Sequence, residues 1–148
     1  MATAYHTDSI QQNVSSIAED LTNYIGRAVC VTEAGVVSLC NDTDQATTEA
    51  LIPYGIIITG TPTTMPQDLE VCSRPGSVVM VTAAETVAKG QPGMVTYSGT
   101  AADRARMGNR TGNTLAAGDW IWGYFLGAGT AGNPVAFMFL PYPFQVAS

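Results

Sequence analysis

The residues of this sequence that could do chemistry are few and widely separated. A hydrolytic triad needs a base that exchanges a proton near neutral pH, which is usually a histidine. The single histidine, His6, lies in a polar stretch near the N-terminus. The carboxylates Glu85, Asp103 and Asp119 each adjoin turn residues, and no spacing joins two of them into the pair that glycoside hydrolysis requires. We therefore expect that the protein is not an enzyme.

Two other patterns resemble ligand-binding sites, but their surroundings do not fit. Residues 127–132 match the GxGxxG pattern of dinucleotide-binding loops, yet Asn133, Pro134 and a β-run follow where a pyrophosphate-binding helix should begin. A Gly-rich hairpin loop is favoured instead. Asp42 and Asp44 could join a calcium site, but the further oxygen ligands of a calcium-binding loop are missing at the required spacing. We expect neither a cofactor nor a metal.

The three cysteines, Cys30, Cys40 and Cys72, cannot all pair within one chain, and none belongs to a CxxC motif. We interpret them as small buried hydrophobic residues. The first 22 residues are polar and do not have the pattern of a signal peptide, and the longest apolar runs are too short to span a bilayer. We expect synthesis in the cytoplasm and no association with a membrane.

The composition favours a protein that functions within an assembly. A chain of 148 residues is long enough for one domain with a real core, but only 12% of its residues are charged, about half the usual quarter. Contacts between protomers would replace part of the solvated surface. The net charge is −6 and Lys89 is the only lysine, so a polyanion would be repelled and nucleic acid is not an expected partner. One basic cluster, Arg104, Arg106 and Arg110, is expected to form a solvated or subunit-pairing edge.

Short β-runs separated by Gly and Pro dominate the chain and predict an all-β barrel or sandwich. A hairpin is expected over residues 28–32 and 36–40, with Gly35 supplying a positive φ, and a strand over 54–59. The later runs are rich in β-branched and aromatic residues; they cover residues 69–73, 77–82, 94–97, 119–126 and 135–140.

Residues 1–22 differ from this pattern, so we expect an N-terminal arm over 1–22 and a β-barrel domain over 23–148. Ile10, Val14, Ile17 and Leu21 recur at helical spacing, which predicts one amphipathic helix. An arm that becomes ordered only against a neighbour is the competing interpretation, since short helices rich in Thr, Ser and Asn are marginal alone.

The aromatic residues near the C-terminus are expected to be divided between the core and a subunit contact. Trp120 and Trp122 share one face of their strand, as do Phe137 and Phe139, and these should be core. Because Pro141 and Pro143 are expected to end the strand, Tyr142 and Phe144 would leave the barrel and dock on another subunit.

A series of short motifs carries a resemblance to a known family. These motifs are residues 26–29 leading into 35–37, then 54–56, 78–90, 118–123, the Gly-rich loop and 135–141. Their order from residue 26 to residue 143 resembles that of the small capsid decoration, or cement, proteins of tailed bacteriophages.

The resemblance implies a compact β-barrel or β-tulip that trimerises on the outer surface of an icosahedral capsid and bridges neighbouring capsomers. It implies a virion location, the major capsid protein as partner, and no catalytic residues. The candidate contacts with the capsid or with other protomers are Ile10, Val14, Ile17, Leu21, Arg104, Arg106, Arg110, Tyr142 and Phe144. An alternative of a different class stays open: a carbohydrate- or receptor-binding β-module of a phage tail or cell surface, in which exposed aromatic residues would stack on sugar rings.

Overall fold

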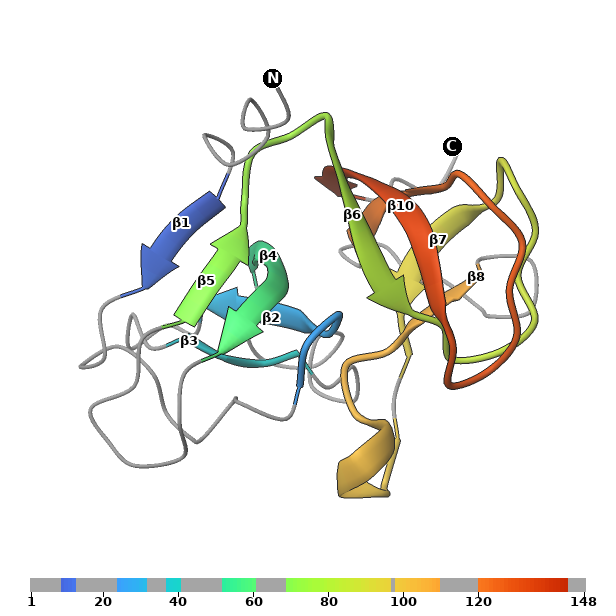
Figure 1. The fold of residues 1–148 in the computed structure, drawn as a ribbon, viewed down its shortest axis with the longest axis horizontal. Coiled ribbons are helices and arrows are strands. Elements are labelled where there is room, and N and C mark those ends of the chain that lie inside the picture. Colours follow the sequence, from blue (N-terminus) through green and yellow to red (C-terminus); the bar gives the residue numbers. More distant parts are fainter. Residues whose placement is uncertain are drawn as a thin grey trace.

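The computed structural model describes residues 9–12, 24–31, 37–40, 52–60, 69–96, 98–109 and 120–143 (Figure 1). These residues form ten β-strands and a single 3-10 turn, η4 (Ala101–Asp103), and no α-helix. None of the described segments is a helix long and apolar enough to cross a membrane. The all-β class expected from the sequence is confirmed.

The strands form two antiparallel sheets of five strands each, which lie side by side in Figure 1. The first sheet has the order β1-β5-β4-β2-β3. Its strands are β1 (Ser9–Gln12), β5 (Leu69–Cys72), β4 (Ile52–Gly60), β2 (Ala28–Val31) and β3 (Val37–Leu39). The expected hairpin is confirmed, since β2 and β3 pair with Val29 opposite Leu39.

The second sheet has the order β6-β10-β9-β7-β8. Its strands are β6 (Ser77–Thr82), β10 (Pro134–Pro143), β9 (Trp120–Phe125), β7 (Pro92–Val95) and β8 (Met107–Asn109). Just after β6, Ala83 forms a parallel bridge with Met107 of β8, and the amide of Ala84 donates to the Met107 carbonyl at 2.9 Å. The last strand of the sheet thus returns toward the first, and the sheet curls around its inner side chains.

The inner face of the second sheet is packed with large apolar side chains. Val81, Val135, Phe137 and Phe139 alternate toward the core along β6 and β10 and are at most 3% exposed. Phe125 meets Phe137 edge to face, with ring centroids 5.2 Å apart. Aromatic burial of this kind stabilises a core strongly because each ring removes a large apolar area from water.

Gly123 changes which face the side chains of β9 occupy. In a regular strand, Trp122 and Phe125 would point to opposite faces, yet both are buried in the same core. The change occurs at Gly123, whose φ is +149°, and a Cβ at this position would overlap the carbonyl oxygen of Met138. Only glycine fits such a close approach with this backbone, so Gly123 allows Trp122 to enter the core.

The two sheets are joined through the turn that precedes β2. The Gly26 amide donates to the Ile57 carbonyl of β4 at 2.8 Å, and the Gly26 carbonyl accepts from the Thr82 amide of β6 at 2.9 Å. The Ala28 amide donates to Ala105 at 3.0 Å, on the loop between β7 and β8. One cluster of buried residues includes side chains from both sheets. The turn therefore links the backbones of the two sheets above a common core.

Two expectations from the sequence are wrong in detail. The helical interpretation of residues 1–22 does not hold at Ser9–Gln12, because β1 is a strand paired with β5, with Ile10 opposite Val71. The other residues of that segment up to Thr22 lie outside the described part of the chain.

The second correction concerns the end of β10. Pro141 does not end the strand: β10 continues to Pro143, and after a bulge that follows Phe139, Tyr142 pairs with Ile121 and Pro143 with Trp120. Proline is tolerated here because β6 begins at Ser77, opposite Phe139, so this part of β10 has only β9 as a described neighbour. Tyr142 therefore remains in the sheet.

Candidate functional site

The two described carboxylates singled out for chemistry hold loops in place. Glu85 Oε1 accepts a hydrogen bond from the Asn109 amide at 2.9 Å, and the Asn109 side chain donates to the Thr86 carbonyl at 3.0 Å. Asp103 pairs with Arg106 at 2.8 Å. Within the described ranges, no three His, Cys, Asp or Glu side chains gather in a way that could hold a metal. Asp119, Asp42, Asp44 and His6 lie outside these ranges.

The Gly-rich segment is a hairpin loop, as expected. It connects the antiparallel strands β9 and β10 and leads into β10 at Pro134. Gly129 forms a bridge with Val87, with N–H···O distances of 2.9 and 3.1 Å, and the Gly132 amide donates to Ala83 at 2.8 Å. These bonds attach the loop to the segment that follows β6, and the loop leads into a strand and not into a helix on which a phosphate could be bound.

The three cysteines singled out in the sequence are buried, at most 3% exposed. Cys30 lies in β2, Cys40 directly follows β3, and Cys72 ends β5. Their burial agrees with the interpretation of these residues as small hydrophobic side chains.

The most distinctive surface of the molecule is the outside of the second sheet. Four of its strands, β6, β7, β9 and β10, contain no charged residue. A sheet with one face on the core and one in water normally alternates apolar and polar side chains. Here most of the outward side chains are apolar as well, and several are well exposed: Val78 (61%), Met80 (51%), Leu140 (39%) and Tyr142 (37%).

These side chains form one continuous strip across three strands. Val78 lies opposite Met138, and Met138 lies opposite Tyr124. The ring of Tyr124 stacks on that of Tyr142, with centroids 6.5 Å apart and the two hydroxyls 3.0 Å apart. We call this strip the outer face; it comprises Val78, Met80, Tyr124, Met138, Leu140 and Tyr142. Large apolar patches of this kind mark sites of protein or ligand contact.

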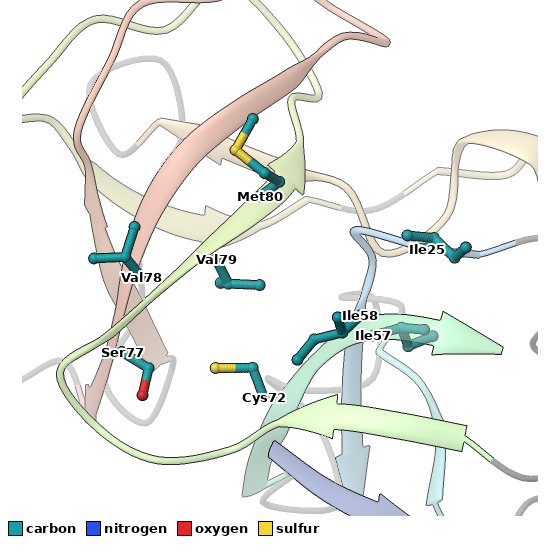
Figure 2. A pocket seen from close by; sticks show the side chains of 8 residues that line it. All are labelled: Ile25, Ile57, Ile58, Cys72, Ser77, Val78, Val79 and Met80. Atoms are coloured by element: carbon teal, nitrogen blue, oxygen red, sulfur yellow. The ribbon is translucent and has the colours of Figure 1, made fainter. Parts of the chain in front are cut away.

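An apolar groove lies beside the outer face, between the two sheets. Figure 2 shows β6 along one side, and Ile57, Ile58 and Cys72 from β4 and β5 along the other. Ile25 also lines it, and its volume is about 400 Å³. The lining residues are apolar except for one serine: Ile25, Ile57, Ile58, Cys72, Ser77, Val78, Val79 and Met80.

β6 presents part of its backbone edge toward this groove. The Ala83 amide bonds to Asn133 on the side of β10, whereas the Thr82 amide bonds to Gly26 on the opposite side. Because successive residues of a strand direct their amides to opposite edges, Val78 and Met80 direct theirs away from β10, as Thr82 does. β6 is the end strand of its sheet among the described strands. The groove therefore offers both apolar side chains and a strand edge.

The described arginines of the predicted basic cluster lie beside a third, buried arginine. Arg27 is 9% exposed and donates from Nη1 to the Arg104 carbonyl at 2.6 Å and from Nη2 to the Ala102 carbonyl at 2.9 Å. Its guanidinium also lies 5.8 Å from the centre of the Tyr24 ring. Burial, followed by repulsion from Arg106, lowers the pKa of Arg27, although Asp103 opposes the shift. The guanidinium remains charged at neutral pH.

The structure places the described contact candidates in three separate parts of the fold. Arg104 and Arg106 flank Ala105 in the loop that Arg27 holds, Tyr142 belongs to the outer face, and Ile10 lies in β1. The remaining candidates lie outside the described residues: Val14, Ile17, Leu21, Arg110 and Phe144. Sequence reasoning missed Val78 and Met80. The signal was present, since the uncharged run of β6 is typical of a strand covered on both faces.

The comparisons with known proteins point to one architecture. No protein-family model matches the sequence, and no curated protein sequence matches it. Among solved structures, the fold is similar to that of the head fiber gp8.5 N base of bacteriophage phi29, with a TM-score of 0.54 and 11% sequence identity. The match covers 88% of this chain and 93% of that chain. At this identity the likeness shows a shared fold over almost the whole length of both chains.

Proposed function

We propose that this protein is a structural component of a phage virion that binds the outer surface of the capsid as a homotrimer and bridges neighbouring capsomers. The observation that carries the association of protomers in this proposal is the uncharged outer face of the second sheet. A surface of this kind is costly in water and is suited to permanent contact with protein. The likeness to a phage head fiber base supports a role on the phage head.

Attachment in this proposal is multivalent. Once one protomer of a trimer has docked, the other two search for their sites at an effective concentration set by the trimer itself, which raises apparent affinity by about 10² to 10⁴ without new contacts. A bound trimer then connects separate capsomers. Because it binds only the assembled shell, it stabilises that state by mass action.

A co-sedimentation experiment tests the proposal. Purified protein is mixed with empty shells assembled from the major capsid protein of the phage that encodes it, and pelleted protein is measured against concentration. Saturable binding, with a plateau at a fixed ratio to the major capsid protein, is expected. Pelleting that is no greater than with an unrelated shell would contradict the proposal.

One observation favours the alternative of a carbohydrate-binding module. Tyr124 and Tyr142 form a stacked pair on the outer face, and Tyr142 is 37% exposed. Exposed aromatic rings of this kind can pack on the apolar faces of sugar rings. Binding to a glycan array that is lost in Tyr142→Ala, together with no binding to shells, would favour this alternative.

A further inference from the structure

We infer that the outer face of the second sheet is the surface through which copies of this chain associate. The inference rests on the proposed homotrimer and names the surface that forms it. The occupant is a second copy of the same chain, placed so that the outer faces of the three copies meet around the threefold axis.

Charge is the first argument for a second copy. Each chain carries a net charge of −6, so two copies that approach each other repel at most orientations. The four strands β6, β7, β9 and β10 contain no charged residue, and the outer face lies within them. On this face two acidic chains can meet without placing like charges against each other. A partner recognised by charge complementarity would find nothing there to pair with.

Symmetry is the second argument. In a cyclic trimer each interface joins two different patches, but residues close to the threefold axis meet their own copies from the other chains, so a patch at the axis must be able to contact itself. An apolar strip meets this condition without any matching of donors and acceptors. Three such strips brought together at a threefold axis would bury Val78, Met80 and Leu140, which are each more than a third exposed in the single chain.

The edge of β6 supplies the third argument. Natural edge strands are usually protected by lysine, proline or a bulge that prevents pairing with other chains. The sequence of β6, Ser-Val-Val-Met-Val-Thr, contains neither lysine nor proline, and its pairing with β10 is regular from Ser77 to Thr82. Val78 and Met80 also place their backbone groups at this edge. A neighbouring copy seated on the outer face would shield the edge as well as the side chains.

The test compares charged substitutions inside and outside the outer face. Val78→Glu, Met80→Glu and the double variant are measured by light scattering from about 1 to 100 µM, beside the wild type. Ala101→Glu is the matched control, because it adds the same negative charge at an exposed position in η4, away from the outer face and from the groove beside it. Circular dichroism and thermal melting verify that each variant is folded.

We expect the wild type and Ala101→Glu to have the mass of an oligomer, and the double variant to be a monomer, with its dissociation constant raised at least about 100-fold. A folded double variant with the wild-type mass would overturn the inference, as would equal dissociation of Ala101→Glu or a monomeric wild type. If the Glu variants do not fold, the neutral pair Val78→Thr and Met80→Gln is measured instead, with weaker association expected and unchanged mass as the contradicting result.

Shell binding is measured separately on the same proteins, so the two proposals can fail independently. An oligomeric wild type that does not bind shells would remove the capsid role and leave the interface intact. A wild type that saturates shells as a monomer would remove the interface and leave the capsid role intact.

Discussion

The guanidinium of Arg27 donates a hydrogen bond of 2.6 Å to the backbone carbonyl of Arg104, a residue 77 positions further along the chain. A second hydrogen bond, to the Ala102 carbonyl, holds the guanidinium at two points. Arg27 precedes β2 of the first sheet, and its two partners lie in the loop between β7 and β8 of the second. A single buried side chain thus attaches a loop of one sheet to the other.

We predict that Arg27→Lys lowers the free energy of unfolding by about 1 to 3 kcal/mol, the cost of hydrogen bonds lost by a buried charged group. A lysine keeps the charge, but its compact ammonium cannot reproduce the planar fork that reaches both carbonyls. Urea denaturation measures the effect. The matched control is Arg74→Lys at an exposed position, expected to change stability by less than about 0.5 kcal/mol. Equal effects of the two substitutions would contradict the role assigned to Arg27.

We predict that Gly26→Ala is more destabilising than Gly90→Ala. Both glycines have positive φ, +81° and +87°, so both substitutions carry a backbone cost of about 1 kcal/mol. A Cβ at Gly26 would also lie 2.9 Å from Thr82 Oγ1 and 3.2 Å from the Thr82 amide, whereas nothing lies within 4 Å of one at Gly90. Denaturation midpoints that are lowered equally would show that the junction of the sheets at Gly26 tolerates a side chain.

We predict that deletion of residues 1–22 leaves a cooperatively folding protein with a lower melting temperature and weaker binding to shells. The deletion removes β1, a four-residue strand at the end of the first sheet, and uncovers β5. Among the described residues, the core of the second sheet is formed by later segments of the chain, among them β6, β9 and β10. Calorimetry and co-sedimentation measure the two effects. Loss of the cooperative transition would show that the N-terminal segment is required for the core.

We predict no binding to duplex or single-stranded DNA at physiological salt. The net charge is −6, and Arg27 and Arg106, which could contact phosphates, are occupied by backbone carbonyls and by Asp103. Fluorescence anisotropy with labelled oligonucleotides up to about 100 µM protein measures this, because non-specific DNA binders have dissociation constants of roughly 10⁻⁴ to 10⁻⁶ M. Micromolar binding that weakens with added salt would overturn the charge argument.

The strands of this fold are predictable from local sequence, because β-branched and aromatic runs between Gly and Pro favour pleated structure in any context. Which strands pair with each other is harder to predict from the sequence, because the partners are distant along the chain. The spacing of Ile10 and later apolar residues predicts a helix in this segment. Residues Ser9–Gln12 form a strand instead because they pair with β5. Such long-range pairing overrides a weak local preference.

The candidate site was predictable only in part for the same reason. The sequence predicts Tyr142 at a subunit contact because the neighbouring prolines were expected to take it out of the sheet. In the structure a bulge in β10 keeps Tyr142 paired with Ile121, and its ring stacks on Tyr124. The role of Arg27 cannot be predicted from its sequence neighbours, because its hydrogen-bond partners are backbone carbonyls distant in sequence. The outer face becomes visible only when Val78, Met138 and Tyr124 are in register.

The most direct measurement of the proposed capsid role is release of the genome from shells with and without this protein. Particles are stripped of the protein, one half is decorated again to saturation, and DNA release is recorded with an intercalating dye as temperature rises. Decorated shells are predicted to release their genome at a higher temperature, because a ligand specific for the assembled shell stabilises that state. Identical release curves, with occupancy confirmed on a gel, would contradict the capsid-stabilising role.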